Sequence, residues 1–184
     1  SRQNNFLIMS IYTYFPKINY KVDEYDSLRA IDITSAIKIK DYLKSYRGIL
    51  YTPYIVKNGD RPDIVSNKLY ADPSYDWILL IANDMYSVYD DWPRNSFDLE
   101  TFIIEKYGSL SSAMSTVKYY YNSSLDIIDQ TTYNNLASTA RRSETQYEYE
   151  LRVNSNKAKI KVVKRSLITA ITSDLNTIAK RPVL

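Results

Sequence analysis

The order of apolar and polar positions predicts a small mixed module near the middle of the chain. The segment "ILYTPYIV" (49–56) is rich in β-branched and aromatic residues, which favours a strand. "KNGD" is typical of a turn. Asp60 and Pro62 then predict the start of a helix that carries Val65 and Leu69 on one face.

A second helix is predicted directly after the first, and it is the most apolar part of the chain. Asp72 and Pro73 repeat the start signal ahead of "WILLIA" (77–82), which has no polar side and should be surrounded by protein. Burying each large side chain contributes roughly 1.5–3 kcal/mol, so this helix should anchor the core. The core residues expected from this pattern and from the last helix are Val56, Val65, Leu69, Trp77, Ile78, Leu80, Ile81, Leu167, Ile171 and Leu175.

The segments on either side of this module have weaker patterns. Residues 1–31 carry scattered aromatic side chains without a sustained period, which indicates an extended arm or an edge strand. Residues 32–46 fit either a strand or a helical spacing, and an extended piece up to about Lys40 is favoured. Ser96 and Gly108 are expected to begin and end a helix, and a strand should follow over 115–122. Residues 122–143 are polar and predict a surface excursion.

The end of the chain alternates in a way that favours a hairpin. "QYEYELRV" (146–153) and "AKIKVVK" (158–164) both show period two, with "NSNK" as the turn. A helix through 140–155 is the competing interpretation. A final helix should begin after Ser166 and end before Pro182. The expected fold class is therefore α+β: an arm (1–47), a small βααβ module (48–95) and a C-terminal strand and helix region (96–184).

Composition narrows the chemistry. The chain has no Cys and no His, which excludes disulfides, thiolate chemistry, Cys/His zinc sites and His-based triads. Three glycines are too few and too scattered for a phosphate-binding loop. The longest strongly apolar run, 77–82, is far shorter than the roughly 20 residues that span a bilayer, so no membrane partner is expected.

Two clusters of charged residues are compatible with a catalytic, calcium or nucleic-acid site, but the sequence does not favour any of these. Asp84, Asp90 and Asp91 lie near an aromatic residue, as glycosidase carboxylates do, but adjacent acids point apart and acidic loops are usually solvated. They also lack the regular spacing of a calcium loop. The basic run around Lys159 and Lys161 is conceivable as a nucleic-acid patch, although neutralisation by the acidic stretch of the predicted hairpin is the simpler reading at a net charge of +3. We predict no catalytic, cofactor or metal site and no nucleic-acid partner.

The tyrosine content is the most unusual number, with 19 Tyr against 4 Phe. A tyrosine has a flat apolar body and a polar tip, which suits surfaces that become buried on assembly. The same rings could simply complete a thin core, so both readings stay open. The candidates for contact with partners are Tyr12, Tyr14, Phe15, Tyr20, Tyr86, Tyr89 and Trp92.

The middle segment resembles a LysM module. The residues that match its pattern are Tyr54, Val56, Lys57, Gly59, Asp60, Ile64, Tyr70 and Asn83. This resemblance implies a βααβ arrangement at 48–95. Many LysM modules bind N-acetylglucosamine polymers, so it also implies, as an alternative function, a peptidoglycan- or chitin-binding module of a protein directed at cell walls.

A longer part of the chain resembles the baseplate wedge proteins of T-even-like contractile-tailed bacteriophages, the gene-53 product family. The matching residues around the two predicted helices are Arg61, Pro62, Tyr70, Pro73, Trp77, Leu79, Leu80, Asn83, Asp84 and Trp92. The likeness continues over 147–180, and more loosely in "YTYFPKINY" (12–20). Ala71 replaces the usual Gly of this family, and residues 109–143 do not align with its pattern.

This second resemblance implies a non-enzymatic structural protein of the virion tail baseplate, assembled in the host bacterial cytoplasm. The implied partners are other baseplate wedge and hub proteins, together with neighbouring wedges of a six-fold assembly. It implies no cofactor. Contacts made through residues 109–143 cannot be transferred from the family.

Overall fold

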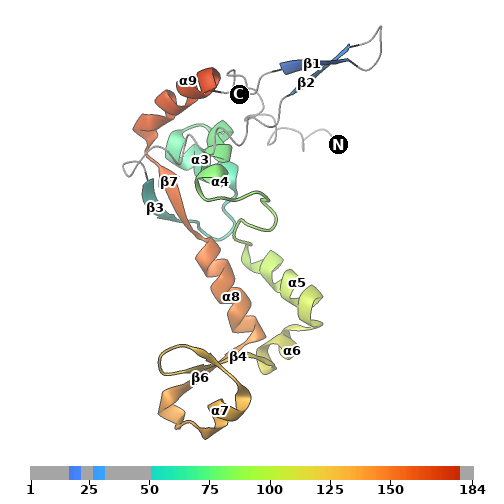
Figure 1. Ribbon diagram of the computed structural model, residues 1–184, viewed down its shortest axis with the longest axis vertical. Coiled ribbons are helices and arrows are strands. Elements are labelled where there is room, and N and C mark those ends of the chain that lie inside the picture. The colour runs from blue at the N-terminus through green and yellow to red at the C-terminus, as the bar shows by residue number, and fades with distance from the viewer. Residues whose placement is uncertain (1–16, 22–26, 32–50, 179–184) are drawn as a thin grey trace. The chain divides into compact units, whose positions relative to one another are not determined.

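The computed structural model describes residues 17–21, 27–31 and 51–178 (Figure 1). The chain divides into two compact units, one of residues 1–56, 60–91 and 160–184 (unit 1) and one of residues 57–59 and 92–159 (unit 2). The segments expected from the sequence, 1–47, 48–95 and 96–184, run consecutively along the chain. Unit 1, in contrast, takes its last strand and helix from the far end of the sequence.

The described part of the predicted arm is a hairpin. Strand β1 (Lys17–Lys21) pairs antiparallel with β2 (Ser27–Ile31), so that Tyr20 lies opposite Leu28 in the register. The other residues of 1–47 lie outside the part of the chain that the structure describes.

Unit 1 contains a strand, two helices and a returning strand in that order. Its elements are β3 (Tyr51–Ile55), α3 (Pro62–Tyr70), the short 3-10 helix η1 (Pro73–Tyr75), α4 (Asp76–Ala82), β7 (Lys159–Val163), η3 (Arg165–Leu167) and α9 (Ile168–Ile178). β3 and β7 form a two-stranded sheet. The expected strand, the two expected helices and the last helix are thus confirmed as elements.

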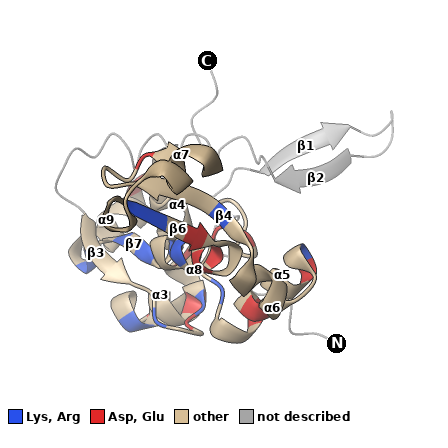
Figure 2. Cartoon of the chain, turned by 90° about the horizontal axis from the view of Figure 1, so that it is seen from below, with Lys and Arg blue, Asp and Glu red and all other residues tan. Residues whose placement is uncertain are grey.

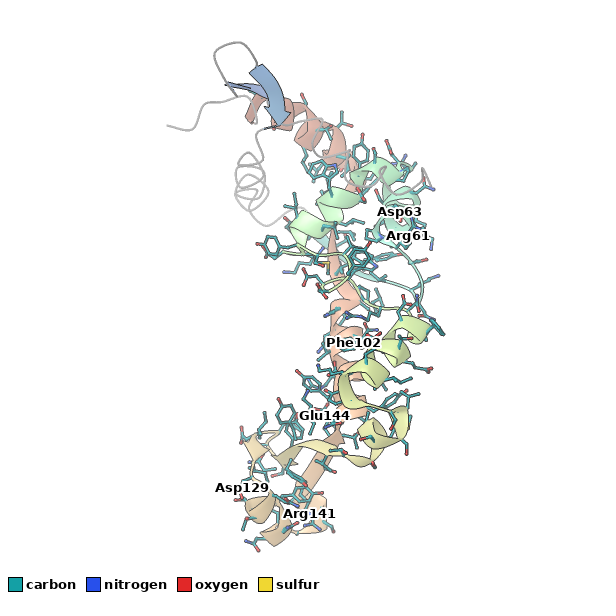
Figure 3. The ribbon with its side chains drawn as sticks, turned by 90° about the vertical axis from the view of Figure 1, so that its right-hand side faces the viewer. Arg61, Asp63, Phe102, Asp129, Arg141 and Glu144 are labelled. Carbon is teal, nitrogen blue, oxygen red and sulfur yellow. The ribbon has the colours of Figure 1, made fainter. Side chains whose placement is uncertain are left out.

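The start of α3 follows from its first residues. Pro62 opens the helix without needing a backbone N–H, and Asp63 adds negative charge to the first turn. The N-cap is Arg61, not the expected Asp60, and its guanidinium donates to both carboxylate oxygens of Asp63 at 3.1 and 2.6 Å (Figure 3). Ala71 closes the helix with a left-handed φ of 61°, a conformation that favours glycine.

The residues Asp72 and Pro73, which were expected to begin the second helix, begin the short helix η1 instead. The side chain of Asp72 accepts from the backbone N–H of Ser74 at 2.8 Å, so it caps η1, and α4 begins only at Asp76. The combination Asp72–Pro73 therefore turns the chain into a 3-10 helix that leads directly into α4.

The core of unit 1 combines residues from the middle of the chain with residues from its C-terminal part. Its buried apolar side chains are Val56, Val65, Tyr70, Trp77, Ile78, Leu79, Ile160, Val162, Val163, Ile168 and Ile171. Of the expected core residues outside this set, Leu69, Leu80, Ile81 and Leu167 are half-buried. The side chain of Leu175 lies outside the described residues. Helix α4 is consequently not enclosed on every side, because the end of the helix keeps part of its surface in solvent.

Unit 2 consists of helices around a small antiparallel sheet. Its elements are α5 (Ser96–Tyr107), α6 (Leu110–Ser115), β4 (Val117–Asn122), β5 (Ile127–Ile128), α7 (Gln130–Asn135), η2 (Ser138–Ala140), β6 (Arg141–Thr145) and α8 (Gln146–Lys157). The strand order is β5-β4-β6. Leu99, Ile103 and Ala113 form its buried apolar cluster, and half-buried side chains such as Phe102 and Tyr147 pack against it.

The predicted hairpin over 146–164 is wrong, and the competing helix is what the chain forms. Thr145 and Glu148 make a capping box, in which each side chain accepts from the other residue's backbone N–H, and this fixes the start of α8. The side chain that α8 buries most is the anionic Glu150, so the helix lacks an apolar stripe by which to recognise it. β7 pairs with β3 instead, which also removes the proposed neutralisation of Lys159 and Lys161 across a hairpin.

Candidate interaction surfaces

The loop after α4 is fixed at its start by the side chain of Asn83. Its amide nitrogen donates to the carbonyl oxygens of Leu79 and Lys161, both at 2.8 Å, and its amide oxygen accepts from the Lys161 N–H at 2.8 Å. One side chain thus satisfies both backbone groups of a β7 residue, as a neighbouring strand would. The end of α4 is therefore held to the sheet.

The loop itself, residues 84–91 (the aromatic loop), is held by its own carboxylates. Asp91 Oδ2 accepts from the backbone N–H groups of Tyr86 and Ser87 at 2.7 and 2.9 Å. The Ser87 hydroxyl donates to Asp90 Oδ2 at 3.0 Å and accepts from the Asp90 N–H at 3.2 Å. Asp90 and Asp91, two of the three carboxylates considered as a catalytic site in the sequence, thus hold the backbone of a turn.

This turn presents two tyrosine rings to solvent. The side chains of Tyr86 and Tyr89 are 79% and 88% exposed. A loop that is already ordered loses little conformational entropy when it binds, and tyrosine is enriched where proteins meet. Among the described residues of unit 1, Tyr86 and Tyr89 are the most exposed large hydrophobic side chains, which makes the aromatic loop a candidate contact surface.

The other expected contact residues fall in different places. Trp92 is only 4% exposed, so it packs inside the chain and is corrected from a surface residue to an interior one. Tyr20 lies on β1, where side chains are not described. Tyr12, Tyr14 and Phe15 lie outside the described residues, and their role stays a prediction.

A second exposed apolar surface lies on α5 and was not predicted from the sequence. Phe97 and Ile104 are 76% and 44% exposed, on the side of the helix opposite the buried Leu99 and Ile103. The sequence signal that could have revealed this surface is the spacing of the two apolar residues. They are seven positions apart, which places both on the same face of a helix after two turns.

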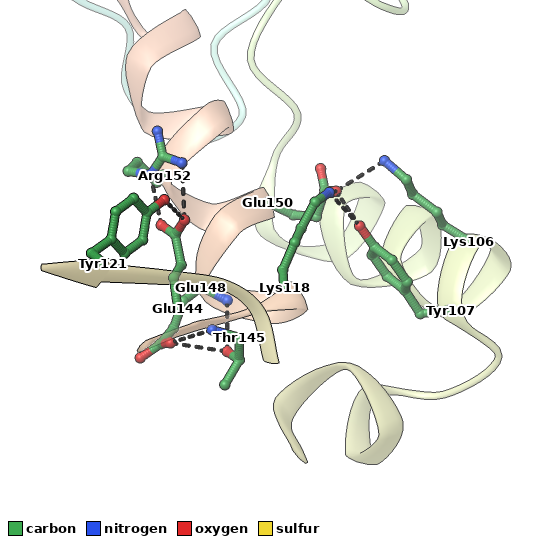
Figure 4. A network of polar contacts seen from close by, with 9 residues as sticks. All are labelled: Lys106, Tyr107, Lys118, Tyr121, Glu144, Thr145, Glu148, Glu150 and Arg152. Carbon is green, nitrogen blue, oxygen red and sulfur yellow. Dashed lines mark hydrogen bonds and ion pairs between the residues drawn. The ribbon is translucent and has the colours of Figure 1, made fainter. Parts of the chain in front are cut away.

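The position of α8 depends on two buried carboxylates (Figure 4). Glu150 Oε1 accepts from the Tyr107 hydroxyl at 2.6 Å and from Lys106 Nζ at 2.9 Å, and Lys118 Nζ lies 3.7 Å from the same oxygen. Lys118 Nζ also sits 3.5 Å from the centroid of the Tyr149 ring. These contacts tie α8 to α5 and to β4.

The second buried carboxylate, Glu144 on β6, connects the sheet of unit 2 to α8. Arg152 donates to its two carboxylate oxygens at 2.6 and 3.0 Å, and the Tyr121 hydroxyl donates at 2.8 Å. A bidentate pair of this kind is among the stronger polar contacts in proteins. These contacts join α8 to β6 and β4 of the sheet.

The protonation of both carboxylates follows from these partners. The hydrogen bonds from Arg152 hold the pKa of Glu144 below its ordinary value, against the opposing effect of burial. Burial alone would raise the pKa of Glu150, yet the hydrogen bonds from Tyr107 and Lys106 hold that pKa below its ordinary value. Burial, together with the bond to Glu150, raises the pKa of Tyr107. Both carboxylates are ionised at neutral pH.

In the part of the chain that the structure describes, acidic residues do not gather in any group of three or more that could hold a metal ion. No helix in the same ranges is long and apolar enough to cross a membrane.

Comparison with known proteins gives one family. The family model described as base plate wedge protein 53 matches residues 10–127. The baseplate wedge protein gp53 of Enterobacteria phage T4 is 27% identical over 115 residues, which cover 61% of this chain and 58% of that protein. The chain thus spans little more than half the length of this curated relative. The likeness noted over 147–180 lies beyond the range of the family model, whereas residues 109–127, which were not expected to align, lie within it. Since the matched range covers well over half of the sequence, the chain belongs to the phage base plate wedge protein 53 family.

Proposed function

We propose that this chain is a structural component of the baseplate in a contractile phage tail, where it joins wedge proteins to one another and to neighbouring wedges. The observation that carries the proposal is the family match over residues 10–127. The role is one of protein–protein contact, without a chemical step. The site of action is the virion tail, after assembly in the host cytoplasm.

The described surfaces support a role in contact. The aromatic loop exposes Tyr86 and Tyr89 on a backbone that is already fixed by Asp91 and Asn83. The buried ion pairs of Glu144 and Glu150 hold α8 in place within unit 2. Rigid surfaces of this kind suit a subunit that must position its neighbours, because little ordering is left to be done on binding.

Genetic complementation tests this role. A phage that lacks the gene is grown in cells that supply the chain from a plasmid, and tails are counted by electron microscopy beside the infectious titre. The wild-type chain should restore contractile tails, whereas Tyr86→Ser with Tyr89→Ser should restore fewer. Ile127→Ser is a matched control, because it also removes an exposed apolar side chain. Normal tails in the complete absence of the chain would contradict the proposal.

The partners within this role are a finer proposal. We expect other wedge proteins, hub proteins and the adjacent wedge of a six-fold assembly to contact the chain. Chemical cross-linking of purified baseplates, read by mass spectrometry, should recover links from this chain to at least two different tail proteins. Links to a single protein would restrict the role to one junction.

The alternative function is recognition of a glycan by a LysM-like module. The order β3, α3, α4, β7, with β3 paired to β7, is compatible with a βααβ module into which unit 2 is inserted. Under this proposal the last strand comes from β7, not from within 48–95. The exposed rings of Tyr86 and Tyr89 would then stack on sugar faces. Titration with N-acetylglucosamine oligomers, followed by NMR shifts, tests it. Unchanged spectra at millimolar sugar would dismiss this alternative.

A further inference from the structure

The outer side of α5 carries an apolar stripe between carboxylates. Phe97, Thr101 and Ile104 follow one another at spacings of four and three residues, so they line one face of the helix. The Thr101 hydroxyl donates to the Phe97 carbonyl oxygen at 3.0 Å, which leaves its methyl group as the part available to a partner. Glu100 lies on one side of this stripe and Glu105 on the other, as the helical period requires.

These two glutamates have no ionic partner on their own chain, as far as the structure describes it. Both are exposed, and neither takes part in any of its ion pairs. The five residues 97, 100, 101, 104 and 105 are called the acidic helix face below. An exposed apolar stripe between uncompensated anions suits a partner that offers apolar surface flanked by cations.

Such a surface exists on the outer side of the β3–β7 sheet. Ile160 and Val162 point into the core, so the alternating Lys159 and Lys161 lie on the outer side, where both are exposed. On β3, Ile55 alternates with the buried Val56 and is 70% exposed. Residues 55, 159 and 161 are called the basic sheet face (Figure 2 colours the basic residues of β7 and the acidic residues of α5).

The lysines of this face are as uncompensated as the glutamates. Lys159 Nζ donates to the neutral Asn156 side chain at 3.0 Å, and in the described ranges neither lysine forms an ion pair. One face therefore carries two anions around apolar side chains, and the other carries two cations on β7 and an exposed apolar side chain on the neighbouring strand β3. Both stand exposed on one chain.

We propose that the acidic helix face of one copy of this chain binds the basic sheet face of a second copy. A helix packed on the outer side of a sheet is a common layer arrangement, and the opposite charges fix its orientation. Because the two faces are different, the contact is heterologous, and each bound pair still offers one free face of each kind. Association therefore proceeds head to tail. It does not depend on the proposed baseplate role.

Sedimentation velocity on the purified full chain tests this contact. The chain is followed from about 1 μM to about 1 mM at low salt, the range in which a modest interface shows its Kd. The mean sedimentation coefficient should rise with concentration. It should rise less at high salt, because the Debye length falls from about 10 Å at 0.1 M to about 3 Å at 1 M.

Neutralising variants make the test specific. Glu100→Gln with Glu105→Gln, and separately Lys159→Gln with Lys161→Gln, should each weaken self-association about tenfold. The chain that carries all four substitutions keeps the wild-type net charge of +3, since two lost anions offset two lost cations, and it should self-associate as weakly as either double variant. All four positions are exposed, so the circular dichroism and melting temperature should be unchanged.

A mixture of the two double variants separates a head-to-tail contact from a symmetric one. Each double variant keeps one intact face, so the mixture should form 1:1 complexes that do not grow. Wild-type chain that stays monomeric at 1 mM, or a fourfold variant that associates as the wild type does, would overturn the inference. Either result leaves the baseplate role untouched, because complementation measures that role separately.

Discussion

A buried carboxylate at the start of α4 gives the sharpest test of how unit 1 is held together. Asp76 is buried, and its Oδ1 accepts from the Trp77 N–H at 2.8 Å. Burial raises the pKa of Asp76 from 3.8 to about 6, and the charge of Asp63 adds to this rise while the Trp77 N–H opposes it. We predict that Asp76→Asn stabilises the fold at neutral pH. The amide keeps an oxygen for the same N–H and removes the buried charge.

The sign and size of the stability change in Asp76→Asn follow from proton linkage. The folded state holds this proton more tightly than the unfolded state, so the stability that Asp76 contributes is greatest below about pH 4 and is lost as the pH rises through about 6. A pKa raised by roughly two units corresponds to about 3 kcal/mol at most, at about 1.36 kcal/mol per unit. The variant should therefore gain about 1–3 kcal/mol at pH 7.5 and close to nothing at pH 4.

Urea denaturation of wild type and variant at pH 4, 5, 6 and 7.5 measures this difference. Comparing the two chains at each pH removes the contribution of every other titrating group. Asp98→Asn is the control, because it neutralises an exposed carboxylate on another helix and should show no such trend. An Asp76→Asn chain that is less stable than wild type at pH 7.5, or a difference that does not change with pH, would refute the reasoning.

Three further predictions concern stability, each measured by urea denaturation. Trp77→Ala should cost about 3–5 kcal/mol through the cavity it leaves, and a variant that unfolds as wild type does would show that the core is elsewhere. Ala71→Gly should gain up to about 1 kcal/mol, since φ is 61° there; a loss would mean that chain entropy outweighs the strain. Glu150→Ala should cost about 2–3 kcal/mol at pH 7, less than for a fully buried pair because Lys106 is partly exposed. Because the folded pKa of Glu150 is lowered, this cost should fade as the pH drops below its ordinary value of 4.5, and a constant cost would contradict the ionic role.

Local chemistry in the sequence was enough to predict the two helices of unit 1. Pro62, Pro73 and Asp72 act within one turn of where they stand, so their effect does not depend on the rest of the fold. The partner of β3 could not be predicted in this way. β7 begins more than a hundred residues after β3, and period two says which face of a strand is buried but not which strand it meets.

The error over 146–157 has a different cause. Tyr147, Tyr149 and Leu151 alternate with charged residues, yet the structure buries Glu150 and leaves Leu151 exposed. A helix that is oriented by a buried ion pair carries no apolar stripe, so a hydrophobic pattern cannot reveal it. The capping box at Thr145 and Glu148 was the local signal that favoured the helix.

The exposed aromatic residues were predicted only in part, because the hydrophobic pattern does not show which rings are buried. Tyrosine content identified the loop that carries Tyr86 and Tyr89, but composition cannot tell which ring turns inward. Trp92 is buried, while Phe97, which the pattern did not select, is exposed. Which ring is buried depends on packing within each unit, and this involves residues far away in the sequence.

The measurement that bears most directly on the baseplate role is the position of the chain in purified virions. A short epitope fused to the chain, supplied by complementation and decorated with antibody–gold, should mark the baseplate end of the tail in electron micrographs. The account predicts label at that end in nearly every intact tail. Label found only in soluble protein from the lysate, with virions that are complete and unlabelled, would contradict it.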